Sequence, residues 1–319
     1  MEADKHEERI PPNVLYHYCS VPTFFSILKN KSIWLSDISK SNDSLELMWI
    51  KDKCKYYILW VWYNYVNARK ASALEPPDTS LFQKVQIMSD RISSANISKS
   101  WVFCLSEKMD NLGQWRGYAD DASGVCIGFK TTFFETADEV AHAIDEDANL
   151  FFRRVRYCNH EIEDFFQNTA RLSSVCAEMK PEAVVELLES AVQCTIWNAE
   201  FFKNEAFQEE AEWRLVFTMS KGDLLCGEKP SIPDPENRLI SSDVFSFADY
   251  GYSVRNKSLV SHIEMRIPRI EEAITEIIIG PKSTLTKEDV ELFLLSLGID
   301  SEKDETQRIR ITKSNISYR

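Results

Sequence analysis

Residues 209–217 read EEAEWRLVF, and this stretch combines an acidic cluster with the pattern of a half-buried strand. Three carboxylates lie within its first four residues. Trp213, Leu215 and Phe217 then occupy every second position, and such positions lie on one face of a β-strand. The apolar face predicts a strand packed on a core. The acidic opposite face is left for water or for a substrate.

On both sides of this strand, the chain contains apolar runs of strand length and of helix length, which follow one another without regular alternation. The predicted strands are 14–18, 33–37, 100–106, 124–129, 153–157, 211–218, 258–267, 274–280 and 308–312. The predicted helices are 22–30, 44–71, 80–95, 131–144, 160–175, 181–204 and 286–298. This order indicates an α+β fold whose core is a mixed, mostly antiparallel sheet with helical insertions.

The sequence contains no convincing linker. Residues 1–12 are charged and end in Pro-Pro, which predicts a flexible tail. We expect residues 13–319 to form a single α+β domain with a helical insertion at about 44–97. The stretch 56–66, YYILWVWYNYV, is apolar but has about half the length needed to span a bilayer. It therefore predicts a buried helix, with an amphipathic helix that binds a membrane surface or a partner as the alternative. No membrane is among the expected partners.

Composition narrows the class of protein. The net charge of −13 argues against a broad nucleic-acid footprint, which needs many Lys and Arg residues. Nine glycines form no phosphate-binding fingerprint, and eight cysteines form no C-x-x-C pair. Reduced, buried thiols are typical of a cytoplasmic protein. No secretory signal precedes the first strand, and His and Cys show no metal-ligand spacing.

Three polar clusters lie next to predicted strands. His17 belongs to the first strand, where a lone His is more often packed than functional. Gln114, Trp115 and Arg116 lie between two strands, where they could clamp an aromatic, phosphate-bearing ligand or simply staple a loop. Glu212 and its neighbours form the third cluster, and such a face is commonly solvated.

Four segments carry a resemblance to a known family. They are LYHY at 15–18 with ILKNKSIWLSDISKSND at 27–43, FCLSEKMDNLGQWRGYADDASGVCIGF at 103–129, EEAEWRLVF, and IIIGPKSTLTKEDVELFLLSLG at 277–298. Together they resemble the bacterial domain-of-unknown-function family 2971 from about residue 14 to residue 319. The resemblance implies a role in antiphage defence through abortive infection, as a toxin-like effector.

A second resemblance implies chemistry. A first-strand His, a helix and strand after it, and a late strand Glu are similar to the His…Glu arrangement of ADP-ribosyltransferases. The resemblance implies NAD as substrate, bound by His17, and Glu212 as the catalytic carboxylate with Glu210 in an E-x-E element. It implies a sheet core of the same type. The further predicted NAD-binding residues are Ser36, assigned by position, Gln114, Trp115, Arg116 and Arg214.

Glycosidic cleavage of NAD builds an oxocarbenium-like cation, which a fixed carboxylate stabilises. Glu212→Gln is therefore expected to remove activity and leave the fold nearly intact. The acceptor could be a protein, a nucleic acid or water, and a partner protein from a defence locus is conceivable. Two alternatives stay open: a non-catalytic sensor or interaction module of a defence system, and a nuclease.

Overall fold

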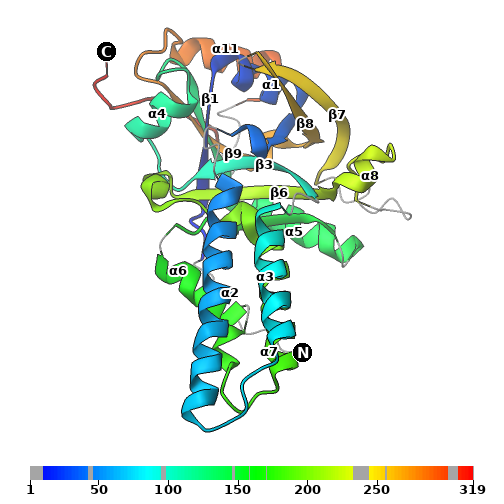
Figure 1. Ribbon diagram of the computed structural model, residues 1–319. Helices are drawn as coiled ribbons and strands as arrows, with labels where there is room; N and C mark the ends of the chain where they lie inside the picture. Colours follow the sequence, from blue (N-terminus) through cyan, green and yellow to red (C-terminus); the bar gives the residue numbers. More distant parts are fainter. Residues whose placement is uncertain are drawn as a thin grey trace. The chain divides into compact units, whose positions relative to one another are not determined.

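The computed structural model of the protein describes residues 10–41, 46–94, 98–145, 148–157, 159–169, 171–232, 244–255, 257–300 and 308–318 (Figure 1). The chain folds into two compact units. Unit 1 consists of residues 1–37, 100–154 and 209–319, and unit 2 of residues 38–99 and 155–208. The predicted tail at 1–9 lies outside the described residues.

Unit 1 is built on a sheet that has ten strands within the described residues. The strands are β1 (Val14–Cys19), β2 (Ser32–Asp37), β3 (Ser98–Ser106), β4 (Val125–Lys130), β5 (Leu150–Arg154), β6 (Glu212–Ser220), β7 (Ser246–Arg255), β8 (Ser258–Arg266), β9 (Ile274–Ile279) and β10 (Arg310–Lys313). Their order is β10-β9-β4-β1-β3-β2-β8-β7, and β6 pairs with both β3 and β5.

The pairing is mostly antiparallel, as the sequence predicts. β1 runs antiparallel to β4 and to β3, and β2 runs antiparallel to β3 and β8. β10 and β9 form a parallel pair. The α+β class with a mixed, mostly antiparallel sheet is therefore confirmed.

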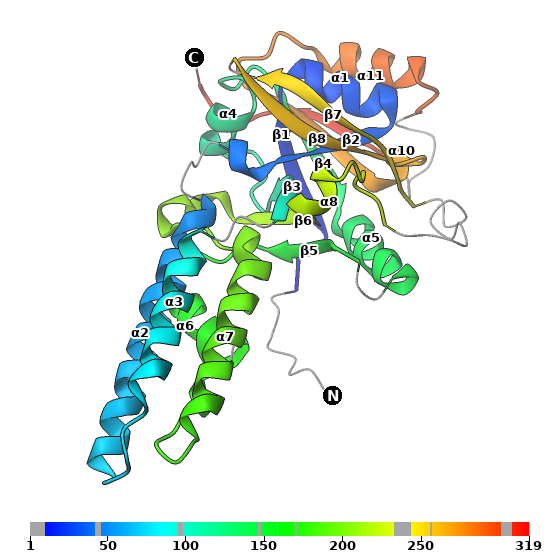
Figure 2. The ribbon, with the colours of Figure 1, turned by 45° about the vertical axis from the view of Figure 1, so that its right-hand side comes forward.

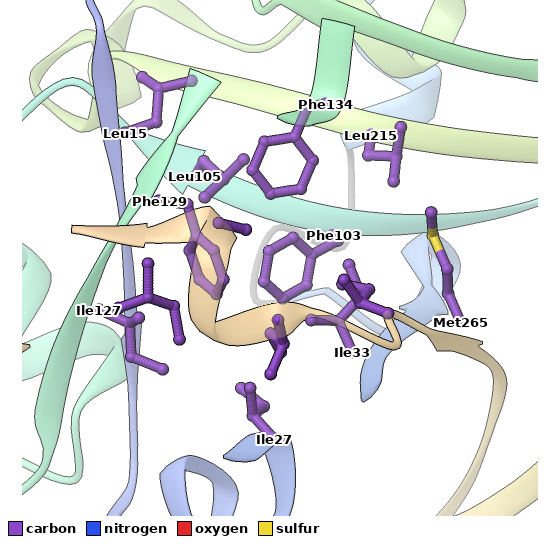
Figure 3. Packing of buried hydrophobic residues seen from close by; sticks show 14 of the residues in the cluster. Leu15, Ile27, Ile33, Phe103, Leu105, Ile127, Phe129, Phe134, Leu215 and Met265 are labelled. Carbon is purple, nitrogen blue, oxygen red and sulfur yellow. The ribbon is translucent and has the colours of Figure 1, made fainter. Parts of the chain in front are cut away.

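One face of this sheet carries the main core of unit 1. Leu15, Phe103, Leu215 and their neighbours on other strands lie on it, as Figure 3 shows. Helices α1 (Val21–Asn30), α5 (Thr131–Ile144) and α11 (Lys287–Ser296) contribute buried side chains to the same cluster. Each helix has one apolar stripe, so it buries that stripe against the sheet. We call the opposite side of the sheet the polar face.

The polar face is not apolar enough to form a second large core. A small cluster lies there, where α4 (Leu112–Tyr118) packs Trp115 and Ala119 against Tyr16, Tyr18 and Cys126. Burial raises the pKa of the Cys126 thiol well above its usual range, so this cysteine stays a neutral packing residue. Within the described part of unit 1, the remaining short α-helices are α8 (Lys221–Leu225) and α10 (Ile270–Ala273).

Unit 2 is helical and has a core of its own. Its helices are α2 (Glu46–Ala71), α3 (Thr79–Ser94), α6 (Asn159–Asp164) and α7 (Pro181–Asn198). α2, α3 and α7 lie side by side (Figure 2) and bury Ile58, Val85, Leu188 and their neighbours. Within the part of the chain that the structure describes, no helix combines the length and the apolar character needed to cross a membrane.

The predicted helical insertion at 44–97 is one half of unit 2, and residues 155–208 supply the other half. The single cooperative domain over 13–319 stays a prediction, because two compact units of one chain can unfold together or separately. Three local predictions are corrected. The strand predicted at 153–157 lies earlier, at β5, while α4 and β7 form in segments with no predicted element.

Candidate functional site

The start of β6 is fixed to the end of β3 by three hydrogen bonds. Ser106 Oγ donates to the Glu210 carbonyl at 2.6 Å, and the Glu107 amide donates to the Ala211 carbonyl at 3.0 Å. The Trp213 indole donates to Glu107 Oε1 at 3.0 Å. Ala211 has a φ of 44°, an uncommon conformation for a residue with a Cβ. The acidic cluster is thus held by β3 in a defined and strained turn.

Glu212 and Arg214 form a closed ion pair on the polar face. Arg214 Nε donates to Glu212 Oε1 at 2.9 Å, and an Arg214 Nη donates to Oε2 at 2.8 Å. Glu212 is 5% exposed and Arg214 is 1% exposed. Both carboxylate oxygens are occupied in the bidentate geometry that guanidinium favours. Because Trp213 points to the main core, these two charges necessarily share the other face.

Glu210 is half-buried, between the exposed Glu209 and the buried Glu212. The Tyr118 hydroxyl, at the end of α4, donates to Glu210 Oε1 at 2.7 Å. Burial, and then the nearby charge of Glu210, raise the pKa of Tyr118 far above its usual range. Tyr118 is therefore a permanent proton donor to Glu210 at neutral pH. Glu212 and Cys104 lie near enough to contribute to the same shift.

The Gln-Trp-Arg motif lies on α4, whose N-terminus is capped by Asn111. Trp115 is fully buried, packs edge-on against Tyr18 and donates from Nε1 to Asp110 Oδ1 at 2.8 Å. The predicted stacking of Trp115 on a ligand does not fit this position, because no ring face is free. Gln114 is also buried.

Arg116 extends from the exposed side of α4 and lies over the Tyr318 ring, 6.0 Å from its centroid. The segment near Tyr318 is held to the same region, because the Tyr318 hydroxyl donates to Asp121 and Ser314 Oγ donates to Asp110. Arg116 is thus the one member of the motif with an exposed cationic group.

His17 lies on the wrong face to act with Glu212. It alternates with Leu15 and Cys19 on the main-core side, and its ring stacks on Phe103 with centroids 4.3 Å apart. Its Nδ1 is 2.9 Å from the Cys104 carbonyl. The prediction that His17 and Glu212 converge on one cleft is therefore wrong, because the two side chains leave opposite faces of the sheet.

Ser36 does share the polar face, since it pairs with Val102, which alternates with the core residues Trp101 and Phe103. It is half-buried on β2. The structure thus brings Glu210, Glu212, Arg214 and Ser36 to one face. Tyr118 is a site residue that was not predicted from the sequence. The available signal was its position two residues after Arg116, in the same polar segment.

The position of His17 leads to a testable pH effect. Burial lowers the pKa of His17 from 6.5 to about 4. A depressed histidine pKa means that protonation favours the unfolded chain, so stability is complete above pH 6.5 and declines as the pH falls towards 4. We expect His17→Phe to remove a slope of about 1.4 kcal/mol per pH unit in that window.

Chemical denaturation of wild type and His17→Phe at several pH values between 6.5 and 4 measures this difference. His262 titrates in the same background in both proteins, so the comparison isolates His17. Equal pH slopes for the two proteins would show that His17 is protonated as easily when folded as when unfolded.

A family model described as a protein of unknown function, DUF2971, matches residues 114–215. The match begins at Gln114 and ends just after the Glu212–Arg214 pair, and it covers less than half of the chain. No curated protein and no solved structure matches the chain. Among the described residues, no group of three or more His, Cys, Asp or Glu side chains is arranged to hold a metal ion.

Proposed function

We propose that the protein is a bacterial antiphage-defence effector that consumes NAD, as an ADP-ribosyltransferase or an NAD glycohydrolase, with Glu210 as its reacting carboxylate. The Tyr118–Glu210 pair is the observation that carries the chemical part of the proposal. The defence role rests on the family resemblance described from the sequence, and the family model supports that resemblance over residues 114–215 only.

Glu210 suits the reaction better than Glu212. Glu212 has both oxygens bound by Arg214 and is almost fully buried, so a sugar cannot approach it without breaking the pair. Glu210 is only partly buried, and the hydrogen bond from Tyr118 helps to orient it. A carboxylate held in this way is positioned before the substrate arrives, which is the condition for electrostatic catalysis.

The reaction breaks the C–N bond between nicotinamide and ribose, and the bonding electron pair leaves with neutral nicotinamide. Glu210 stabilises the oxocarbenium-like cation that develops on the ribose. A nucleophile of a protein, a nucleic acid or water forms the new bond to the anomeric carbon, and it loses its proton to Glu210. Arg116 is an exposed cation on neighbouring α4, suited to a pyrophosphate.

The non-catalytic interaction module is the second candidate, and the closed Glu212–Arg214 pair favours it. A buried, bidentate pair without a free oxygen is the geometry expected of a structural carboxylate. The burial of Trp115 and the core position of His17 fit the same interpretation. Under it, the polar face and α4 hold structure, and a partner protein from the defence locus would bind elsewhere.

The experiment uses NAD labelled in its adenosine half, the purified protein and a bacterial lysate. Free nicotinamide and label on macromolecules are measured separately, which distinguishes hydrolysis from transfer. We expect Glu210→Gln to lower nicotinamide release by on the order of 100-fold, because an amide supplies no negative charge. Glu209→Gln is the matched control, because Glu209 is the exposed neighbouring carboxylate.

The result also separates the two candidates. If wild type releases no nicotinamide but protects cells from phage, and Glu210→Gln protects equally well, the interaction module is correct. If Glu209→Gln and Glu210→Gln lose activity equally, the loss reflects the acidity of the segment, and Glu210 has no specific role.

A further inference from the structure

A second group of charged side chains lies on the polar face, on strands β2, β8 and β7. The strand registers place Trp34 opposite Glu264, and Glu264 opposite Asp249. In the next row, Ser36 lies opposite His262, and His262 opposite Gly251. Directly paired residues in antiparallel strands point to the same side, with Cβ atoms about 5 Å apart. Trp34, Glu264, Asp249 and His262 are therefore neighbours, and we call them the Trp34 site.

Two carboxylates directly opposite each other are an unfavourable pair in a sheet. Glu264 accepts one hydrogen bond, from Ser32 Oγ at 2.7 Å, and Asp249 is exposed. Arg266 and Arg255 lie on the same strands, but within the described residues neither forms an ion pair with Glu264 or Asp249. Water at the exposed Asp249 and the charge of Arg255, which also acts on the pKa of His262, offset part of the repulsion between the two carboxylates. The pair nevertheless keeps room for a directly bound cation.

Trp34 offers a binding surface beside these carboxylates. Although β2 is an inner strand, Trp34 is 43% exposed. Its ring stacks on the His262 ring with centroids 3.8 Å apart and an interplanar angle of 12°. His262 is tightly placed beneath it, because a Cβ on Gly251 would lie 3.3 Å from His262 Nε2. The indole is therefore held flat on the sheet, supported from below.

His262 itself is unusual among the described residues. Its side chain is only 8% exposed, and its Nδ1 is buried without a hydrogen-bond partner. Burial lowers the pKa of His262, so the ring is neutral at physiological pH. A neutral imidazole adds no positive charge beneath the indole, so it does not repel a cation on the exposed face of the Trp34 ring.

We propose that the Trp34 site binds a guanidinium group. A guanidinium is a planar cation that lies flat on an indole and donates to a carboxylate through two parallel N–H bonds. An ammonium lacks the planar stacking surface, and a neutral amide lacks the charge that would separate Glu264 from Asp249. The ligand is either a small guanidine or an arginine side chain on a peptide.

The proposal is independent of NAD chemistry, since it names residues outside the β6–α4 cluster. Another explanation of the Trp34–His262 stack is purely structural: large rings commonly cover a glycine on a neighbouring strand. That explanation predicts no ligand and assigns no role to Glu264 and Asp249.

The test is an NMR titration that follows the indole N–H resonance of Trp34, assigned by its loss in Trp34→Phe. The probes are arginine amide, lysine amide, citrulline amide and a short peptide with one central arginine. We expect a saturable shift with arginine amide and much weaker responses to lysine and citrulline amides. Stronger binding of the peptide assigns a protein arginine, and equal binding assigns a small guanidine.

Calorimetry with arginine amide tests the individual residues. We expect Trp34→Ala to weaken binding by about 3- to 30-fold, as for loss of a cation–π contact. Glu264→Gln, which keeps the side-chain shape, should also weaken binding, whereas Trp197→Ala removes an exposed ring on α7 and should change nothing. No saturable shift, equal responses to the three amides, or unchanged affinity in Trp34→Ala and Glu264→Gln would overturn the proposal.

Discussion

Trp213→Ala is expected to lower the free energy of unfolding by about 3–5 kcal/mol. Trp213 is almost fully buried in the main core and stacks on Phe152 with ring centroids 5.3 Å apart. Its removal leaves a cavity in the main core beside Phe152, and the sheet cannot close this cavity because β5 and β6 stay paired. The substitution also removes the donor to Glu107, which is left with one bond fewer.

Denaturant unfolding of the variant and wild type measures this loss. Trp197→Ala is the matched control, because Trp197 is 61% exposed and its truncation opens no cavity. We expect the control to stay within about 0.5 kcal/mol of wild type, as exposed substitutions usually do. A Trp213→Ala protein as stable as the control would mean that β6 does not pack on the main core.

Glu212→Gln is expected to destabilise the fold by about 3–5 kcal/mol, the usual cost of breaking a buried ion pair. Gln keeps the shape and can still accept one hydrogen bond from Arg214. It cannot compensate the guanidinium charge, and Arg214 is almost completely inaccessible to water. This replaces the expectation from sequence that Glu212→Gln leaves the fold nearly intact, which assumed that the stability of the strand comes from the apolar face of Trp213, Leu215 and Phe217.

A double variant tests whether the charge is the cause. Glu212→Leu with Arg214→Met replaces both charges by apolar groups of similar length, and such replacements of buried pairs are often neutral. We expect it to recover much of the stability lost in Glu212→Gln, measured by the shift in melting temperature. Glu210→Gln serves as the control from the accessible side of the cluster. If Glu212→Gln melts like wild type, the pair is not closed in solution.

Most strands and helices could be predicted because each contains its own periodicity. β6 alternates Trp213, Leu215 and Phe217, and α11 begins with the Thr286 capping box that the pattern TKED indicates. α4 was missed because it is short and contains two glycines, which lower helix propensity. β7 was missed although Tyr250, Tyr252 and Val254 alternate, because polar residues and Gly251 interrupt the apolar pattern.

The candidate site was predicted less well, for a geometric reason. Alternation within one strand tells which side chains share a face, so His17 could be grouped with Leu15 and Glu212 could be separated from Trp213. It does not tell how the faces of two distant strands correspond, because that depends on pairing and register. A partial signal was the apolar face within each strand. His17 shares its face with the core residue Leu15, whereas Glu212 lies on the face opposite the core residue Trp213.

The division of the chain between its two units has a consequence for the order of folding during synthesis. Unit 2 has all of its segments once residue 208 has been made. At that point five of the ten described strands of unit 1, β6 to β10, have not been made. β1 already has both of its neighbours, β3 and β4, but β4 still lacks β9 and β2 still lacks β8. The helical unit can therefore complete its core on the ribosome, while unpaired strand edges of the sheet wait for the last third of the chain.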